Sequence, residues 1–121
     1  MAYLIELPTY ADERGTLTVV EKLLPFDIKR FYCIYQASSQ RGGHRHKTTT
    51  QAMICLGGSC EIYVNDGKKK QIFALNSPNK CLVLMPEDWH TMDKFSFSST
   101  LLILASKFYD KDDYIDEQYD S

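Results

Sequence analysis

Two histidines, His44 and His46, are separated by a single residue and follow the glycines Gly42 and Gly43. In an extended strand, residues two apart project to the same face, so the two imidazoles would lie side by side while Arg45 would project the other way. Such a pair can bind a metal, transfer protons or recognise an anion. A solvent-exposed polar strand end is the alternative, and the basic residues that flank the pair favour a functional site.

The elements expected around this pair are short strands. Turn residues separate them, and Asp66-Gly67 is a two-residue hairpin signal. The segment 87–90 is expected to be a loop, and the tail 110–119 a short helix or an ordered extension. Strands with turns every eight to twelve residues predict an all-β sandwich or barrel, with 100–105 as an interior strand buried on both faces. The expected strands are 3–7, 16–22, 30–37, 51–56, 59–65, 68–75, 81–85 and 100–105.

Composition limits the classes of protein to consider. With 121 residues, 44% hydrophobic and 25% charged, the chain predicts one globular domain over 1–121. The net charge of -2 argues against general nucleic-acid binding. The N-terminus lacks the basic region of a signal peptide, and no apolar run approaches the roughly twenty residues that span a bilayer. Four cysteines without a Cys-x-x-Cys pair predict small buried thiols in a reduced, cytoplasmic protein: Cys33, Cys55, Cys60 and Cys81.

The histidine pair also belongs to a longer pattern. The run from Gly43 to His46, followed by Gln51 and Gly58, resembles the first motif of the cupins, in which a glutamate usually stands where Gln51 is. The segment 86–90, which ends in His90, resembles the second cupin motif, although it is one residue short and lacks the usual glycine. The resemblance implies a double-stranded β-helix, or jelly-roll barrel, with a short C-terminal extension.

A metal site on His44 and His46 is not expected. Cupin metals are usually held by three histidines and a carboxylate, whereas Gln51 is neutral and a poor ligand. His90 has the wrong spacing for the third histidine. The odd offset from His46 to Gln51 also requires a bend before both can face inward.

Read over its whole length, the chain resembles the dTDP-4-keto-6-deoxyglucose 3,4-ketoisomerases, small sugar-nucleotide cupins of the WxcM-like group. This implies a metal-independent, cofactor-free enzyme that binds dTDP-4-keto-6-deoxyglucose. The resemblance further implies that this enzyme supplies a 3-keto sugar to an aminotransferase, on a route to 3-amino-3,6-dideoxyhexoses of lipopolysaccharide or S-layer glycans. It also implies a homodimer, often formed by exchange of N-terminal strands, for which 3–7 is the candidate. The motifs that carry the resemblance are 12–15, 25–30, 41–47, 66–67 and 109–114.

The resemblance assigns His44 and His46 as the acid/base pair that moves the ketone from C4 to C3 through an enediol. Either histidine can be the base, because a pKa near 6.5 suits both roles. Tyr35 is a catalytic candidate for stabilising the enediolate, and a core aromatic is the equal alternative. The substrate-binding candidates are Arg41, Arg14, Gln51, Arg45 and Lys47, because a cluster of basic residues suits an anionic sugar nucleotide.

Two other functions remain open from the sequence. A sugar-nucleotide 3,5-epimerase shares the Asp-x-Arg-Gly turn at 12–15, and its product would keep the ketone at C4. A non-catalytic cupin that binds a sugar or a metal would be distinguished by stoichiometric metal that is lost when His44 or His46 is replaced.

Overall fold

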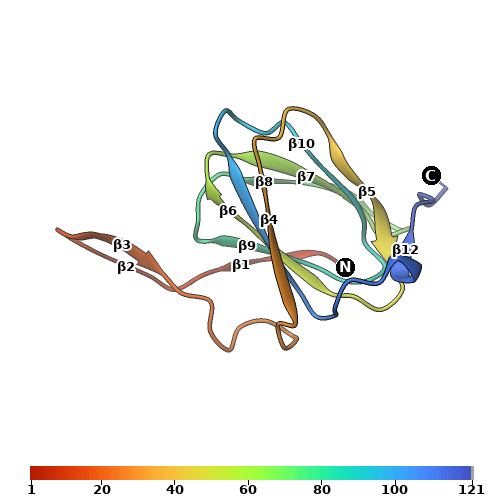
Figure 1. The fold of residues 1–121 in the computed structure, drawn as a ribbon, viewed down its shortest axis with the longest axis horizontal. Helices are drawn as coiled ribbons and strands as arrows, with labels where there is room; N and C mark the ends of the chain where they lie inside the picture. Colours follow the sequence, from red (N-terminus) through yellow and green to blue (C-terminus); the bar gives the residue numbers. More distant parts are fainter. Residues whose placement is uncertain (121) are drawn as a thin grey trace.

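The computed structural model describes residues 1–120, which form two five-stranded antiparallel sheets and a separate hairpin (Figure 1). The first sheet contains, in spatial order, β1 (Tyr3–Glu6), β9 (Lys80–Leu84), β6 (Gln51–Gly57), β11 (Thr100–Ala105) and β4 (Arg30–Tyr35). The second contains β12 (Tyr114–Ile115), β5 (Arg41–His46), β10 (Trp89–Asp93), β7 (Cys60–Asn65) and β8 (Lys70–Leu75). The hairpin is formed by β2 (Thr9–Asp12) and β3 (Gly15–Thr18), and a 3-10 turn, η1 (Lys111–Asp113), precedes β12. The predicted all-β class is confirmed.

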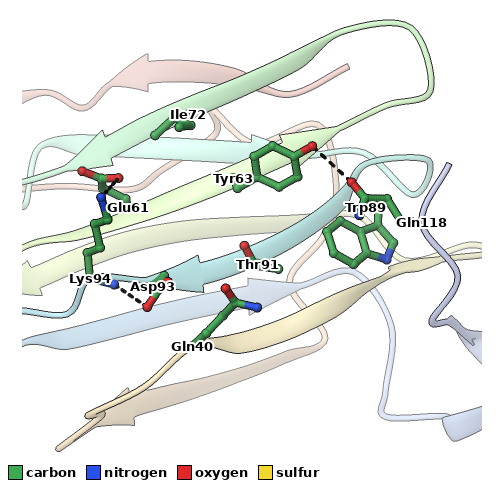
Figure 2. A pocket seen from close by; sticks show the side chains of 9 residues that line it. All are labelled: Gln40, Glu61, Tyr63, Ile72, Trp89, Thr91, Asp93, Lys94 and Gln118. Atoms are coloured by element: carbon green, nitrogen blue, oxygen red, sulfur yellow. Dashed lines mark hydrogen bonds and ion pairs between the residues drawn. The ribbon is translucent and has the colours of Figure 1, made fainter. Parts of the chain in front are cut away.

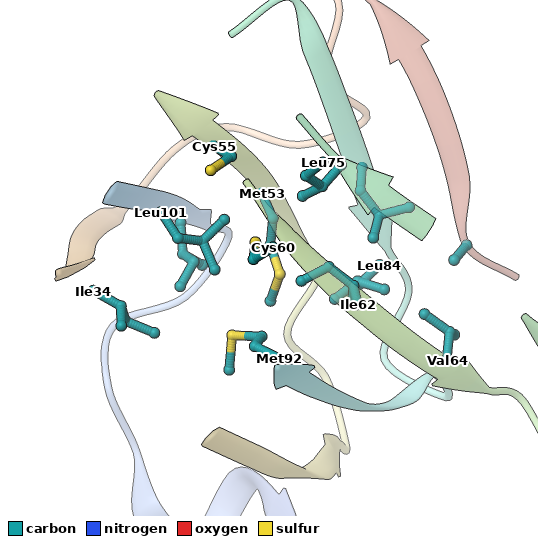
Figure 3. Packing of buried hydrophobic residues seen from close by; sticks show 13 residues of the cluster. Ile34, Met53, Cys55, Cys60, Ile62, Val64, Leu75, Leu84, Met92 and Leu101 are labelled. Carbon is teal, nitrogen blue, oxygen red and sulfur yellow. The ribbon is translucent and has the colours of Figure 1, made fainter. Parts of the chain in front are cut away.

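The main hydrophobic core lies between the inner faces of the two sheets (Figure 3). Alternation along β7 directs Ile62 and Val64 inward, and β6 contributes Met53 and Cys55 in the same way. Burial of each large aliphatic side chain stabilises the fold by roughly 1.5–3 kcal/mol. This core holds the two sheets at a fixed distance and so positions the polar residues at their ends.

The first sheet is covered on its outer face as well. Ala52, Ile54 and Leu104 pack there against the segment 20–26. The prediction that 100–105 is an interior strand buried on both faces is therefore confirmed, because β11 pairs with β6 on one side and with β4 on the other. The predicted strand 16–22 is shorter than expected, since β3 ends at Thr18 and the chain then turns to cover this face.

The sequence analysis missed strand β10, and it also missed β2 of the hairpin. The segment 87–90 was expected to be a loop, but Trp89 and His90 begin β10, which pairs with both β5 and β7. The loop prediction failed because a short polar strand between two neighbours has little apolar periodicity of its own. The tail follows the second of its two expectations, with η1 and β12 forming an ordered extension.

The β2–β3 hairpin extends away from the two sheets, at the left of Figure 1. Every residue of β2 is exposed, and Tyr10 and Leu17 have exposed fractions of 66% and 58%. Within residues 1–120 this arm pairs with no other strand, and an isolated two-stranded hairpin is only marginally stable in water.

The four cysteines form no disulfide, and Cys55, Cys60 and Cys81 are buried. Cys33 is exposed on the outer face of β4, which corrects the expectation that all four thiols are buried. Within residues 1–120, no helix is long and apolar enough to cross a membrane.

Candidate functional site

The three histidines of the chain meet on the inner face of the second sheet. His44 and His46 lie on β5, and His90 of the neighbouring β10 is directly opposite His44 in the strand register. The ring centre of His44 is 5.2 Å from that of His46 and 5.0 Å from that of His90. The expectation that His44 and His46 share a face is confirmed, and tertiary structure adds His90.

A glycine permits this close approach of β5 and β10. Gly42 has φ = +88°, and a Cβ atom there would lie 3.0 Å from the carbonyl oxygen of His90 and 3.2 Å from Cε of Met92. The register between the strands shifts at this point. Any other residue would be strained at this φ and would push β10 away, so the glycine before the histidines has a structural role in the site.

The C-terminal segment supplies the other side of the cluster. β12 pairs with the end of β5, so that Tyr114 is opposite His46. The ring of Tyr114 is 4.7 Å from that of His44 and 4.5 Å from that of His46. Asp113 accepts a hydrogen bond at Oδ2 from Nδ1 of His46 at 3.0 Å. The predicted extension is therefore part of the site.

A pocket of about 300 Å³ opens beside His44, whereas His46 and His90 are buried and do not line it. Two guanidinium groups face it, those of Arg30 and Arg41. The Arg30 guanidinium carbon lies 5.0 Å from the ring centre of Tyr32 and 5.6 Å from that of Tyr109, which holds the charge between two aromatic faces. The residues that line the pocket are Arg30, Tyr32, Ile34, Arg41, Gly42, His44, Met92, Tyr109 and Tyr114.

Gln51 lies behind this pocket, with its side chain buried. Its Nε2 donates a hydrogen bond to the hydroxyl of Tyr32 at 3.0 Å. Gln51 is thus placed to orient a phenol that faces the pocket, a role different from the direct substrate contact that the sequence analysis expected.

Burial dominates the acid–base properties of the histidines. Burial, and then the charge of His46, lower the pKa of His44 to about 4. Burial lowers the pKa of His90 to about 3, although its hydrogen bond to the Asp88 carbonyl opposes the shift. Burial also lowers the pKa of His46, and the hydrogen bond and charge of Asp113 oppose it. All three imidazoles are therefore neutral at pH 7 and able to accept a proton.

The structure places four predicted residues away from the pocket. Tyr35 is exposed at 65% on the outer face of β4, so Tyr32 takes the position that was expected for it. Arg45 faces outward, with its guanidinium carbon 4.4 Å from the ring centre of Tyr119. Lys47 is exposed just after β5 and is absent from the pocket wall.

Arg14 is the fourth of these residues. It lies at the tip of the β2–β3 hairpin, where its guanidinium forms an exposed ion pair with Asp12 at 2.7 Å. Within one chain it does not contact the pocket. The strand alternation explains Tyr35 and Arg45, because neighbours of inward-facing residues must face outward.

Sequence reasoning missed several residues of the site. Arg30 belongs to the predicted strand 30–37 and to the family motif 25–30 but was not among the predicted site residues, and His90 was considered only as a metal ligand with unsuitable spacing. The strand 30–35 carries aromatic residues on both faces, so alternation alone could not distinguish Tyr32 from Tyr35. The run 109–114 was recognised as a family motif, but nothing in it indicated contact with His46. The residues missed are Arg30, Tyr32, His90, Tyr109, Asp113 and Tyr114.

The histidine cluster was also considered as a metal centre. Among the described residues, 1–120, no group of three or more His, Cys, Asp and Glu side chains has a geometry that could hold a metal ion. In addition, Nδ1 of His46 and Nδ1 of His90 are both engaged, with Asp113 and with the Asp88 carbonyl. The expectation of metal-independent chemistry stays a prediction.

A second hollow, of about 380 Å³, lies on the outer face of the second sheet (Figure 2). None of the predicted site residues lines it. Its polar groups are largely satisfied by one another, since the hydroxyl of Tyr63 donates to Oε1 of Gln118 and Lys94 lies 3.9 Å from Glu61. The pocket beside the histidines is therefore the candidate active site.

Comparison with known proteins relates the chain, over nearly its whole length, to one family. Residues 2–121 match the family model described as "WxcM-like, C-terminal" (FdtA). A TDP-4-oxo-6-deoxy-alpha-D-glucose-3,4-oxoisomerase from Aneurinibacillus thermoaerophilus is 42% identical over 114 residues, which cover 91% of this chain and 81% of that protein.

Solved structures are similar over nearly the whole chain. A double mutant of the QdtA 3,4-ketoisomerase from Thermoanaerobacterium thermosaccharolyticum, in complex with TDP, has a TM-score of 0.91 and 42% identity, and covers 96% of this chain and 87% of that one. A single mutant of QdtA in complex with TDP-4-keto-6-deoxyglucose has a TM-score of 0.91 and 39% identity, with the same coverage of 96% and 87%. These neighbours confirm the predicted cupin-like fold.

Proposed function

The chain belongs to the WxcM-like, C-terminal (FdtA) family, and on this premise we propose that it is a TDP-4-keto-6-deoxyglucose 3,4-ketoisomerase. The relatives with 39% to 42% identity are 3,4-ketoisomerases or the equivalent oxoisomerase, which favours this isomerase over the 3,5-epimerase alternative. The observation that carries the proposal is the pocket in which neutral His44 lies beside two guanidinium groups.

The reaction requires only proton transfers. A base removes the proton from C3 of the sugar, and the C4 carbonyl oxygen takes up a proton to form the 3,4-enediol. The C3 hydroxyl then loses its proton as C4 gains one, which leaves a ketone at C3 and a hydroxyl at C4. Two neutral imidazoles whose ring centres are 5.2 Å apart suit such transfers between adjacent carbons.

In this proposal, Arg30 and Arg41 stabilise the negative charges of the intermediate and of the diphosphate. The intermediate carries developing negative charge on the oxygens at C3 and C4, and the diphosphate of the nucleotide is a permanent anion. Arg30 is held between two tyrosine rings in the pocket wall, so it is preorganised for an anion. The hydroxyl of Tyr32, oriented by Gln51, is a neutral donor on the same side.

We also propose that the enzyme acts without a metal ion and as a homodimer. The predicted exchange strand, 3–7, forms β1 and pairs with β9 of its own chain, so the exposed β2–β3 hairpin is the element that supports a dimer. A second copy would cover Tyr10 and Leu17 and give the hairpin the packing that it lacks. Packing of this hairpin on a second copy would also bring Arg14 close to that copy, where it could bind the substrate diphosphate. Four cysteines without disulfides support a cytoplasmic location.

In this proposal, the product is a 3-keto sugar nucleotide. A ketone at C3 is the group that an aminotransferase converts to an amine, so an aminotransferase is the expected next enzyme. The amino sugar would then enter a surface glycan such as lipopolysaccharide or an S-layer glycan.

The test is proton NMR of the purified, metal-stripped protein with TDP-4-keto-6-deoxyglucose in deuterated buffer. A new 3-keto species, with deuterium at C4 if the acid exchanges with solvent, is the expected result. Deuterium at C3 and C5 with the ketone retained at C4 would identify an epimerase instead. No reaction until a metal is added would contradict the metal-independent mechanism.

A further inference from the structure

The C-terminal extension brings a tyrosine against the histidine pair. β12 lies beside the end of β5, which places Tyr114 opposite His46 (Figure 1). The ring of Tyr114 is edge-on to that of His44, with 4.7 Å between ring centres and 68° between the planes. It is tilted by 58° against the ring of His46, at 4.5 Å. One phenol, from a distant part of the chain, therefore packs against both imidazoles of the pair.

Tyr114 also faces the pocket. It lines the cavity of about 300 Å³ together with His44, and its side chain is half-buried. Its hydroxyl makes no hydrogen bond to any group of residues 1–120, and it is not one of the fully buried polar atoms that lack a partner. The hydroxyl is therefore accessible and has a hydrogen bond to donate.

A second phenol, that of Tyr32, enters the pocket from the other sheet. Tyr32 lies on β4 of the first sheet and Tyr114 on β12 of the second. Burial, and then the charge that Tyr114 would carry if ionised, raise the pKa of Tyr32, so this phenol keeps its proton at neutral pH. A further tyrosine of the pocket wall, Tyr109, is 65% exposed and packs on Arg30. Tyr32 and Tyr114 are thus the more buried phenols of the pocket.

The backbone fixes Tyr114 in its position. The amide of Asp113 donates to the carbonyl of Asp110 at 3.0 Å, and the amide of Lys47 donates to the carbonyl of Asp113 at 2.8 Å. Asp113 also accepts at Oδ1 from the amide of Thr48 at 2.8 Å. The residue directly before Tyr114 is held by three hydrogen bonds, so the phenol needs little reorganisation to bind an anion.

The proposed isomerisation creates two oxygens that need donors. Loss of the C3 proton places negative charge on the oxygen at C4, and loss of the C3 hydroxyl proton places it on the oxygen at C3. A phenol that keeps its own proton stabilises such an oxygen by donating a hydrogen bond. The pocket offers two of these donors, one from each sheet.

We propose that Tyr114 is a catalytic residue whose hydroxyl donates a hydrogen bond to one of these two oxygens, while Tyr32 donates to the other. This assignment rests on the proposed ketoisomerase function. Tyr114 keeps its proton throughout, so the proton transfers of the reaction are unchanged. The C-terminal extension then takes a direct part in the reaction in addition to packing against the histidines.

The Tyr114→Phe variant removes the hydroxyl and keeps the ring that packs on His44 and His46. We expect kcat to fall at least about tenfold, and KM to change less than about threefold, because the donor acts on charge that develops only during the reaction. The matched control is Tyr35→Phe, which removes an exposed phenol on the outer face of β4 and should leave kcat unchanged. Equal kcat for Tyr114→Phe and the unmodified protein would overturn the proposal.

Two further measurements separate a catalytic hydroxyl from a structural one. Tyr114→Phe should unfold at the same urea concentration as the unmodified protein, since the hydroxyl has no partner within residues 1–120. Calorimetric titration with TDP, which lacks the sugar, should give the same Kd for both proteins. A lower unfolding midpoint would assign the hydroxyl to the fold, and weaker binding of TDP would assign it to the nucleotide; either result would overturn the proposal.

The double variant Tyr32→Phe/Tyr114→Phe tests whether the phenols serve different oxygens. Independent donors should give a loss of kcat equal to the product of the two single losses, about 10²-fold. A double variant no slower than the slower single variant would overturn the assignment to separate oxygens. Absence of turnover in the unmodified protein would overturn the proposed function itself, whereas turnover that Tyr114→Phe matches would overturn only the role of Tyr114.

Discussion

The Nε2 atom of Gln51 lies 3.0 Å from the hydroxyl of Tyr32 and donates a hydrogen bond to it. The two residues belong to different strands of the first sheet, β6 and β4, with β11 between them. This pair brings a phenol to the wall of the histidine pocket, where the sequence had pointed to Tyr35.

Replacing Tyr32 by Phe tests this correction. The change leaves Nε2 of Gln51 buried without an acceptor, so we expect the free energy of unfolding to fall by about 1–3 kcal/mol. We also expect kcat to fall about tenfold, because the pocket loses a donor to the enediolate. Tyr35→Phe is the matched control and should leave both quantities unchanged, as measured by urea unfolding and by NMR turnover. An activity loss confined to Tyr35→Phe would contradict the placement.

His44→Asn should abolish turnover while the protein still binds the nucleotide. The imidazole faces the pocket and the Asn amide cannot exchange a proton near neutral pH, so we expect kcat to fall by at least about 10²-fold. Calorimetric titration with TDP should give nearly the same Kd as the unmodified protein. Unchanged kcat would remove His44 from the proton transfers.

Stability should fall as the pH is lowered below 6.5. The folded-state pKa of His90 is about 3, below its ordinary value of 6.5, so the unfolded chain binds a proton that the folded one does not. This contribution is fully present above pH 6.5 and is lost as the pH falls towards the folded pKa, at up to about 1.4 kcal/mol per pH unit.

Urea unfolding at pH 7, 6, 5 and 4 measures this effect. The His90→Asn variant should show a shallower loss of stability between pH 6 and pH 4 than the unmodified protein. Parallel curves for the two proteins would mean that His90 is not a buried neutral group. The pKa of Asp113 is also lowered, to about 2, and its stabilisation is likewise lost as the pH falls, but only below about pH 4, so it does not confuse the comparison.

The dimer proposal predicts an effect of charge on the exposed hairpin. Leu17→Asp should convert a dimer to a monomer, because Leu17 is an exposed apolar residue that a second copy would bury. Light scattering coupled to size exclusion measures the mass. Phe97→Asp is the control, since Phe97 is exposed at 97% in a loop remote in sequence from the hairpin. A monomeric unmodified protein at micromolar concentration would contradict the proposal.

Much of the fold could be predicted from local sequence. Strand 100–105 was identified because it is apolar on both faces, and the position of the 66–67 turn because Asp-Gly favours a hairpin. β10 was missed, because its pairing with two neighbours, and not its own pattern, makes it a strand. β3 was predicted too long, because Val19 and Val20 after Thr18 are β-branched, yet Val20 packs over the first sheet instead of continuing the hairpin.

The sequence by itself determined the histidine pair, its shared face and the family, because all three depend on residue types at short, fixed spacing. Only the tertiary structure decided which tyrosine enters the pocket, because both faces of β4 carry aromatic residues and alternation does not say which face is inner. Tertiary structure alone also joined Asp113 to His46 and His90 to His44, since contacts between distant segments depend on strand register and on the path of the chain. Arg14 lies on an exposed hairpin, which the sequence also could not show: its motif identifies a turn but does not say what that turn packs against.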